Sequence, residues 1–183
     1  MKVFLIMISL LLTCASTAQV KMRDVFKALP DTIVPYLTEN NRLDCIDFKE
    51  ADMKAEVRNE LDGRTELQQL TADYASLRLN EAVSIQMRLL PTTTSEVIIC
   101  MVTTYGTENK ESTIAFYTTK WELLDRSLFI GWPQDQIYTI TMDSQEPVLT
   151  LTPTTFLEHP AIEGQQNTQI LPINLKWNGR EFK

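Results

Sequence analysis

The sequence predicts an α+β fold in which two N-terminal helices pack on a mainly antiparallel, twisted sheet of about eight or nine strands. Three observations support it. Apolar residues recur every three or four positions up to about Asp52, which is typical of helices. After Asp52 they alternate with polar residues, which is typical of strands. The later connections are too short for crossover helices, and short connections join antiparallel neighbours.

Both predicted helices have an apolar face and clear end signals. The first covers residues 22–29 and ends before Pro30, which biases the preceding residue away from helical angles. Its apolar face comprises Met22, Val25, Phe26 and Leu29. Thr38 is a suitable N-cap for the second helix, which reaches about Ala51. The inner face of this helix, closed by Met53, is expected to comprise Leu43, Cys45, Ile46 and Phe48.

Several segments have the pattern of strands. Asp62-Gly63 gives the strongest hairpin signal, because a glycine in a two-residue turn tolerates positive φ. In the strand before this turn, the apolar Ala55, Val57 and Leu61, together with Asn59, alternate with charged residues and are expected to share one face. Residues 74–79 and 83–89 alternate, so each is expected to have one face in water. Further strands are predicted at residues 112–121, 137–142, 147–152 and 171–177.

Residues 97–102, VIICMV, have no polar face at all. A strand of this composition is expected at the centre of a sheet that is covered on both sides. The two N-terminal helices are the natural cover for one of those sides.

The first residues, MKVFLIMISLLLTCASTAQV, have the order of a secretory signal peptide. We expect cleavage after Ala18, so that residues 1–18 are the signal peptide and residues 19–183 form a single α+β domain. The apolar run is shorter than the ~20 residues of a membrane-spanning helix, so no membrane span is predicted. The expected location is outside the cytoplasm, most simply the periplasm. A lipoprotein anchored at Cys14 is less favoured, because Thr13 fits the lipid-attachment signal poorly.

Composition argues against nucleic acid and nucleotide partners. The chain has 17 basic and 24 acidic residues, and loss of the signal peptide removes one basic residue, which leaves a net charge of −8. No concentrated basic segment is present to neutralise phosphates. The five glycines are scattered and form no phosphate-binding loop, so no cofactor is expected.

Asp44 and Asp47 are a candidate carboxylate pair, because residues three apart lie side by side on a helix. Such a pair could bind a cation or share acid and base roles. The same positions lie on or near the solvent flank of an amphipathic helix, with Arg42 and Lys49 nearby, and this structural interpretation is favoured. Asp62-Gly63 lacks the spacing of a calcium loop.

His159 is the only histidine, so a serine or cysteine nucleophile with an imidazole base would have to use it. No GxSxG motif presents a serine, and one histidine with two distant cysteines does not form a common zinc site. The favoured interpretation is a turn histidine before Pro160. We therefore assign no catalytic, cofactor-binding or metal-binding residue.

Cysteines and tryptophans leave two points open. Cys45 and Cys100 could form a disulfide if their α-carbons lay ~4.4 to 6.8 Å apart, but two separately buried thiols are favoured. Trp121 and Trp177 end predicted strands and are expected to cap the core. Trp132 lies in a predicted loop, and whether its ring is exposed is left open.

A set of sequence stretches spread along the chain carries a resemblance to a known family. They are MRDVFKALPDTIVPYLTENNRLDCIDF, MKAEV, LDG, SLRL, MRLLP, VIICMVTTYG and FYTTKWELL. In combination they resemble a family of exported Bacteroidales proteins designated domain of unknown function 3256, over essentially all of residues 19–183. The resemblance implies location and one unified fold. It implies no activity, ligand or catalytic residue.

We therefore expect an exported, non-enzymatic protein that binds a partner protein or an envelope component through an exposed sheet face or loops. The sequence identifies neither the partner nor the oligomeric state. The alternative is a hydrolase that acts on envelope or dietary glycans, which predicts an acidic cleft with two inward carboxylates about 5 to 9.5 Å apart.

Overall fold

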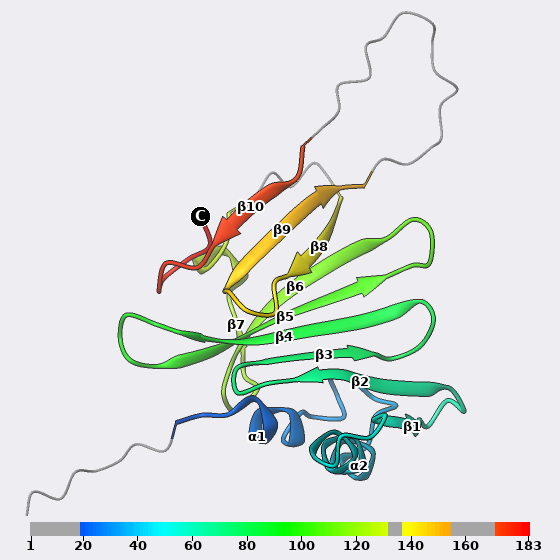
Figure 1. Cartoon of the computed structure of the whole chain (residues 1–183). Helices are drawn as coiled ribbons and strands as arrows, with labels where there is room; N and C mark the ends of the chain where they lie inside the picture. The colour runs from blue at the N-terminus through cyan, green and yellow to red at the C-terminus, as the bar shows by residue number, and fades with distance from the viewer. Residues whose placement is uncertain (1–18, 132–136, 155–170) are drawn as a thin grey trace, which may run out of the picture.

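The α+β class is confirmed by two α-helices that precede the strands (Figure 1). The structure is a computed structural model and describes residues 19–131, 137–154 and 171–183. The predicted signal peptide, Trp132 and His159 lie outside these ranges. In chain order the elements are α1 (Met22–Lys27), α2 (Glu39–Glu50), β1 (Glu56–Arg58), β2 (Arg64–Leu70), β3 (Tyr74–Arg78), β4 (Val83–Pro91), β5 (Val97–Tyr105), β6 (Glu111–Thr118), β7 (Leu123–Leu124), the 3-10 helix η1 (Arg126–Leu128), β8 (Tyr138–Met142), β9 (Val148–Pro153) and β10 (Ile173–Lys176).

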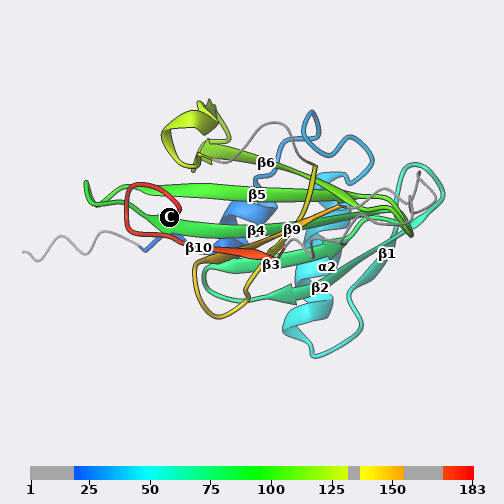
Figure 2. The same ribbon diagram turned by 90° about the horizontal axis from the view of Figure 1, so that it is seen from above.

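The strands form two sheets rather than the single sheet that was expected. The main sheet contains β1 to β7 in sequence order, and the small sheet has the order β10-β9-β8. Every pair of neighbouring strands is antiparallel, as predicted. The helices lie on one side of the main sheet and the small sheet on the other (Figures 1 and 2). The described residues thus form ten strands in two layers, against the expected eight or nine in one.

Strand β5 is buried on both faces, which confirms the interpretation of VIICMV. Its two faces contribute to different cores. The helix-side core, between the helices and the main sheet, includes Phe26, Ile46, Leu77, Met87, Ile99 and Met101. The inter-sheet core, between the two sheets, includes Leu90, Ile98, Cys100, Val102, Phe116, Ile140 and Leu151.

The helices begin and end close to the predicted positions. All four apolar residues of the α1 face are buried. Thr38 caps α2: its hydroxyl oxygen accepts a hydrogen bond from the backbone N–H of Asn41, whose side chain accepts one from the Thr38 N–H. No helix among the described residues is long and apolar enough to cross a bilayer.

The inner face of α2 differs from the prediction. Cys45 and Ile46 are buried, but Leu43 and Phe48 are only half-buried. Met53 is 55% exposed and does not close the face. The third buried residue of α2 is Arg42. Its guanidinium donates hydrogen bonds to the carbonyl oxygens of Lys27 and Leu37 and to the Asp31 carboxylate. A long charged side chain can be buried in this way when its donors are paired.

The connection between β1 and β2 is not the predicted two-residue turn, because it covers residues 59–63. Positive φ occurs at Asp62 (58°) and not at Gly63. The buried Asn59 organises the loop: its side-chain oxygen accepts from the N–H groups of Leu61 and Gly63. A Cβ at Gly63 would lie 3.3 Å from this side chain, so glycine provides close approach here. Leu61 is therefore exposed and does not continue the apolar face.

Strand β4 also differs from its prediction, because its second half is covered on both faces. Arg88 is 1% exposed and lies within the inter-sheet layer. Its guanidinium donates to the Asp73 carboxylate over 2.6 Å and to the Asp143 carbonyl oxygen over 2.7 Å. The same group lies 5.2 Å from the centre of the Tyr74 ring. Gln86 and Arg88 of β4 therefore face the small sheet and not water.

Side chains of the main sheet also form hydrogen bonds with the backbone of β8, along the edge that has no neighbouring strand. The Gln86 side chain accepts a hydrogen bond from the Met142 N–H and donates one to the Met142 carbonyl oxygen, each over 3.0 Å. The Ser112 hydroxyl accepts one from the Ile140 N–H over 2.9 Å. Since β8 pairs with β9 on one side only, these bonds satisfy backbone groups that would otherwise be unpaired.

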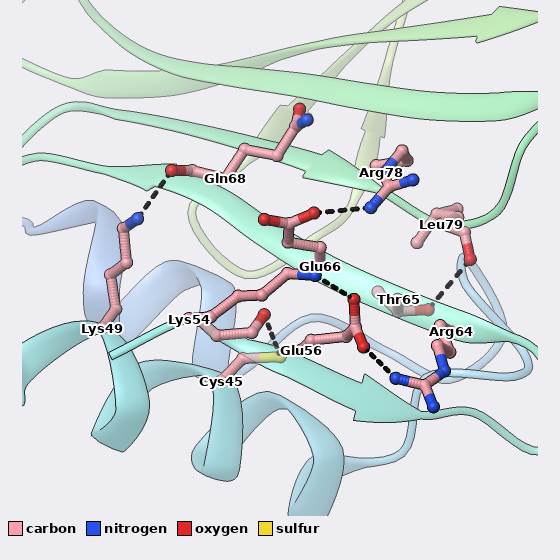
Figure 3. Close-up of polar contacts among 11 residues, drawn as sticks. Cys45, Lys49, Lys54, Glu56, Arg64, Thr65, Glu66, Gln68, Arg78 and Leu79 are labelled. Carbon is pink, nitrogen blue, oxygen red and sulfur yellow. Dashed lines mark hydrogen bonds and ion pairs between the residues drawn. The ribbon is translucent and has the colours of Figure 1, made fainter. Parts of the chain in front are cut away.

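The edge of the main sheet that is formed by β1 carries a series of ion pairs (Figure 3). The Glu56 carboxylate accepts from Lys54 over 2.6 Å and from Arg64. On the neighbouring strands, Arg78 donates to Glu66 over 2.6 Å. Lys49 of α2 donates to the carbonyl oxygen of Gln68 over 2.7 Å. A three-residue edge strand lined by charges is a poor template for further strands.

Replacing Asp73 with alanine should lower the free energy of unfolding by about 2 kcal/mol, because the buried Arg88 guanidinium loses a charge-assisted hydrogen bond. Equilibrium unfolding in urea measures the change. The matched control is Asp44→Ala, which removes an exposed carboxylate from α2 and should change stability by less than about 0.5 kcal/mol. Similar losses in both variants would contradict this role of Asp73.

Glu56 should make stability depend on pH. Hydrogen bonds from Lys54 and Arg64 lower the pKa of its carboxyl from 4.5 to about 2. Such a group stabilises the fold above its unfolded-state pKa, and this contribution is lost as the pH falls toward about 2. In urea titrations between about pH 6 and about pH 2, the gap in stability between the wild type and Glu56→Gln should therefore narrow as pH falls. A gap that stays constant would disprove the assignment.

Candidate ligand-binding groove

The carboxylates singled out in the sequence do not form a site. Asp44 and Asp47 are both exposed on α2, on the solvent flank that was favoured for them. Asp62 forms an ion pair with Arg58 over 2.8 Å, and both side chains are exposed. Within residues 19–131, 137–154 and 171–183, no three histidine, cysteine or acidic side chains gather as metal ligands would.

Cys45 and Cys100 are free and lie in different cores. Cys45 belongs to the helix-side core, and Cys100 to the inter-sheet core on the other face of the main sheet. Burial raises the pKa of the Cys45 thiol from 9.0 to about 11, and burial also raises the pKa of Cys100. Both are therefore protonated thiols that pack as apolar side chains, and neither is activated as a nucleophile.

Trp121 and Trp177 are buried core residues, as predicted. The Trp121 indole N–H donates to the Val25 carbonyl oxygen over 3.2 Å and so ties the end of β6 to α1. The Trp177 indole N–H donates to the Pro91 carbonyl oxygen over 2.7 Å. With their polar groups paired inside the fold, these rings are not available to a ligand.

A groove of about 370 Å³ lies on the helix side of the main sheet, which we name the tyrosine groove. Its wall is the loop between α1 and α2, which Figure 2 shows passing beside β5 and β6. The wall residues are Thr32, Ile33, Val34 and Tyr36. The sheet contributes Leu79, Val83, Ile85, Met101, Thr103, Tyr105, Thr113, Ala115 and Tyr117.

Strand pairing places the sheet residues of the groove next to one another. Thr103 of β5 lies opposite Thr113 of β6, and Met101 lies opposite Ala115. Residues two apart on a strand point to the same face, so Tyr105 and Tyr117 extend this row at its ends. The wall lies between Ala28, the C-cap of α1, and Thr38, the N-cap of α2. Pro30 lies in this segment and disfavours a continuous helix through it.

Three tyrosines define the character of the groove. Burial raises the pKa of Tyr36 and of Tyr117 above 10.0, and the neighbouring Tyr105 contributes in both cases. The Tyr36 and Tyr117 phenols are therefore neutral and act as hydroxyl donors and acceptors. The Tyr117 ring is steadied by a tilted contact with Trp121, with ring centres 5.4 Å apart. Tyr105 is the most accessible of the three, at 42% exposed.

Among the residues that the structure describes, no charged side chain lines the tyrosine groove. The lining therefore provides no carboxylate, imidazole, ammonium or thiolate for acid, base or nucleophilic chemistry. It combines an aliphatic floor with hydroxyl groups, which is the composition of a site that binds and orients a ligand.

Two other pockets are less suited to ligand recognition. The larger, about 830 Å³, lies at the turn between β4 and β5 and contains a single carboxylate, Glu96. The hydroxyls of its rim are partly used within the turn, where Thr92 contacts Thr94 and donates to the Glu96 carbonyl oxygen. A third pocket, about 160 Å³, also contains one carboxylate, Glu81. Neither has the two opposed carboxylates of a glycoside hydrolase.

Sequence reasoning missed the tyrosine groove, although one signal was present. Alternation along residues 101–105 and 113–117 places Tyr105 and Tyr117 on one face of neighbouring strands. The contribution of Tyr36 depends on how the loop crosses the sheet, and no local pattern specifies that path.

Comparisons with known proteins agree with the fold and add no activity. One solved structure, described as a domain of an uncharacterized protein from Porphyromonas gingivalis W83, is similar with a TM-score of 0.69 and 18% identity. The similarity covers 88% of this chain and 96% of that one. No curated protein matches the sequence.

The sequence also matches the model of a family described as "Protein of unknown function (DUF3256)". The match extends over residues 14–153, which is less of the chain than the resemblance implied. It includes every element from α1 to β9 and leaves β10 outside. The chain therefore belongs to the DUF3256 family of proteins of unknown function.

Proposed function

We propose that this chain is an exported, non-enzymatic protein that binds a partner protein or an envelope component through the tyrosine groove. The observation that carries the proposal is the uncharged lining of that groove, with three tyrosines around an aliphatic floor. Such a lining favours recognition over catalysis, because catalysis of acyl, glycosyl or phosphoryl transfer uses groups that ionise or coordinate metals.

The order of residues at the N-terminus supports export. A charged start, an apolar run from residue 3 to residue 12 and small residues up to Ala18 are the features that signal peptidase substrates share. The periplasm is the simplest destination, and a lipid anchor at Cys14 is the less favoured alternative.

The hydrolase alternative has no observation in its favour. It requires two carboxylates that face each other across a cleft. The three pockets described above contain at most one carboxylate each.

Export predicts the N-terminus of the protein isolated from cells. Peptide mass spectrometry of the periplasmic fraction should find a first residue of Gln19 and no lipid. A chain that starts at Met1 and stays in the cytoplasm would contradict export. A lipidated Cys14 at the N-terminus would replace the periplasmic location with an anchored one.

Binding through the groove predicts that the purified protein sediments with isolated cell envelopes. Tyr105→Ala should weaken this association by at least about tenfold, because truncation of an accessible aromatic in a recognition site removes a large share of the binding energy. The control is Leu123→Ala, which removes a side chain that is 72% exposed on β7 and outside the groove. Equal association of both variants and the wild type, or no association of any, would refute the proposal.

A further inference from the structure

The hydroxyl groups of the tyrosine groove are available to a ligand. Six side chains in the lining carry a hydroxyl, and none of them forms a hydrogen bond with another described residue. They are Tyr36, Tyr105, Tyr117, Thr32, Thr103 and Thr113. Elsewhere in the described fold, strand hydroxyls such as those of Thr104 and Ser112 pair with each other, here over 2.8 Å.

The charge and polarity of the groove restrict the class of ligand. A charged ligand would lose its hydration without gaining a partner of opposite charge, because the lining has none. A wholly apolar ligand would cover the six hydroxyls and leave them unpaired, which also costs free energy. The ligand must therefore be uncharged, carry several hydrogen-bonding groups and present an apolar face to Val83 and Ala115, the part-exposed aliphatic residues that the sheet contributes to the lining.

An extended peptide meets these conditions less well than a sugar does. Peptides are commonly recognised through free backbone groups at a sheet edge. The groove lies on the face of the sheet, where β5 is paired along its length with β4 on one side and β6 on the other. A peptide backbone that lay over β5 would therefore find no free backbone partners in that strand.

We propose, on the basis of the proposed function, that the tyrosine groove binds a neutral glycan. One or more uncharged sugar units of this glycan lie against the aliphatic floor. A sugar ring presents C–H groups on its faces, which are attracted to the electron-rich faces of aromatic rings, and hydroxyls around its rim. The six hydroxyls of the groove can both donate to and accept from that rim.

Calorimetric titration of the purified protein tests the ligand class directly. The probes are neutral gluco-, manno- and galacto-oligosaccharides, with uronic acid oligomers of similar length as charged counterparts. At least one neutral series should bind, and the charged series should bind about tenfold more weakly or not at all. Stronger binding of the charged oligomers would overturn the proposal.

Matched variants locate the binding within the groove. Tyr117→Phe keeps the ring and removes one hydroxyl, so affinity for the neutral oligosaccharide should fall by about threefold to tenfold. Thr113→Val should do the same from the neighbouring position. Thr141→Val is the control, because Thr141 is an exposed strand threonine of the small sheet. Unchanged affinity in both groove variants would overturn the site.

Treatment of the envelopes separates failure of this proposal from failure of the proposed function. Periodate oxidation of envelope sugars should abolish groove-dependent sedimentation, whereas prior digestion of the envelopes with protease should leave it intact. The reverse result would overturn the glycan and keep a protein partner for the same groove. Sedimentation that does not depend on the groove under any treatment would overturn both.

Discussion

The fold depends on the need to remove both faces of β5 from water. Six successive apolar residues, 97–102, cannot be satisfied by one covering layer, because neighbouring side chains on a strand point to opposite faces. The helices provide the cover on one side, and the three strands of the small sheet provide it on the other. Each cover lies against one face only, so neither could bury β5 alone. The layered architecture follows from that single segment.

Polar side chains fix how the small sheet sits on the main one. Apolar packing is non-directional and would allow the two layers to slide. The hydrogen bonds of Gln86, Arg88 and Ser112 to the backbone around β8 have defined directions. They join β4 and β6 of the main sheet to an edge of the small sheet. In this way the same bonds that compensate for burying polar groups also select one relative position of the sheets.

Local patterns predicted most of the elements but not the layers. The spacing of apolar residues and the cap at Thr38 located both helices, since these signals act within a few residues. The alternation of Gln86 and Arg88 with apolar residues was interpreted as a wet face, because a polar residue that bonds to another layer has the same sequence pattern as one that bonds to water. The sequence pattern likewise gave no sign that Arg42 is buried. The groove combines a loop with three strands, so its existence depends on long-range packing that periodicity does not encode.

The thiols of Cys45 and Cys100 lie in separate cores, one on each side of a seven-stranded sheet. No cross-link between them is compatible with the native packing, and each is shielded from oxidants by its own apolar surroundings. The packing of the described residues thus needs no electron acceptor in order to form. It is accessible whether the surroundings are reducing or oxidising, because no sulfur bridge holds these two cores together.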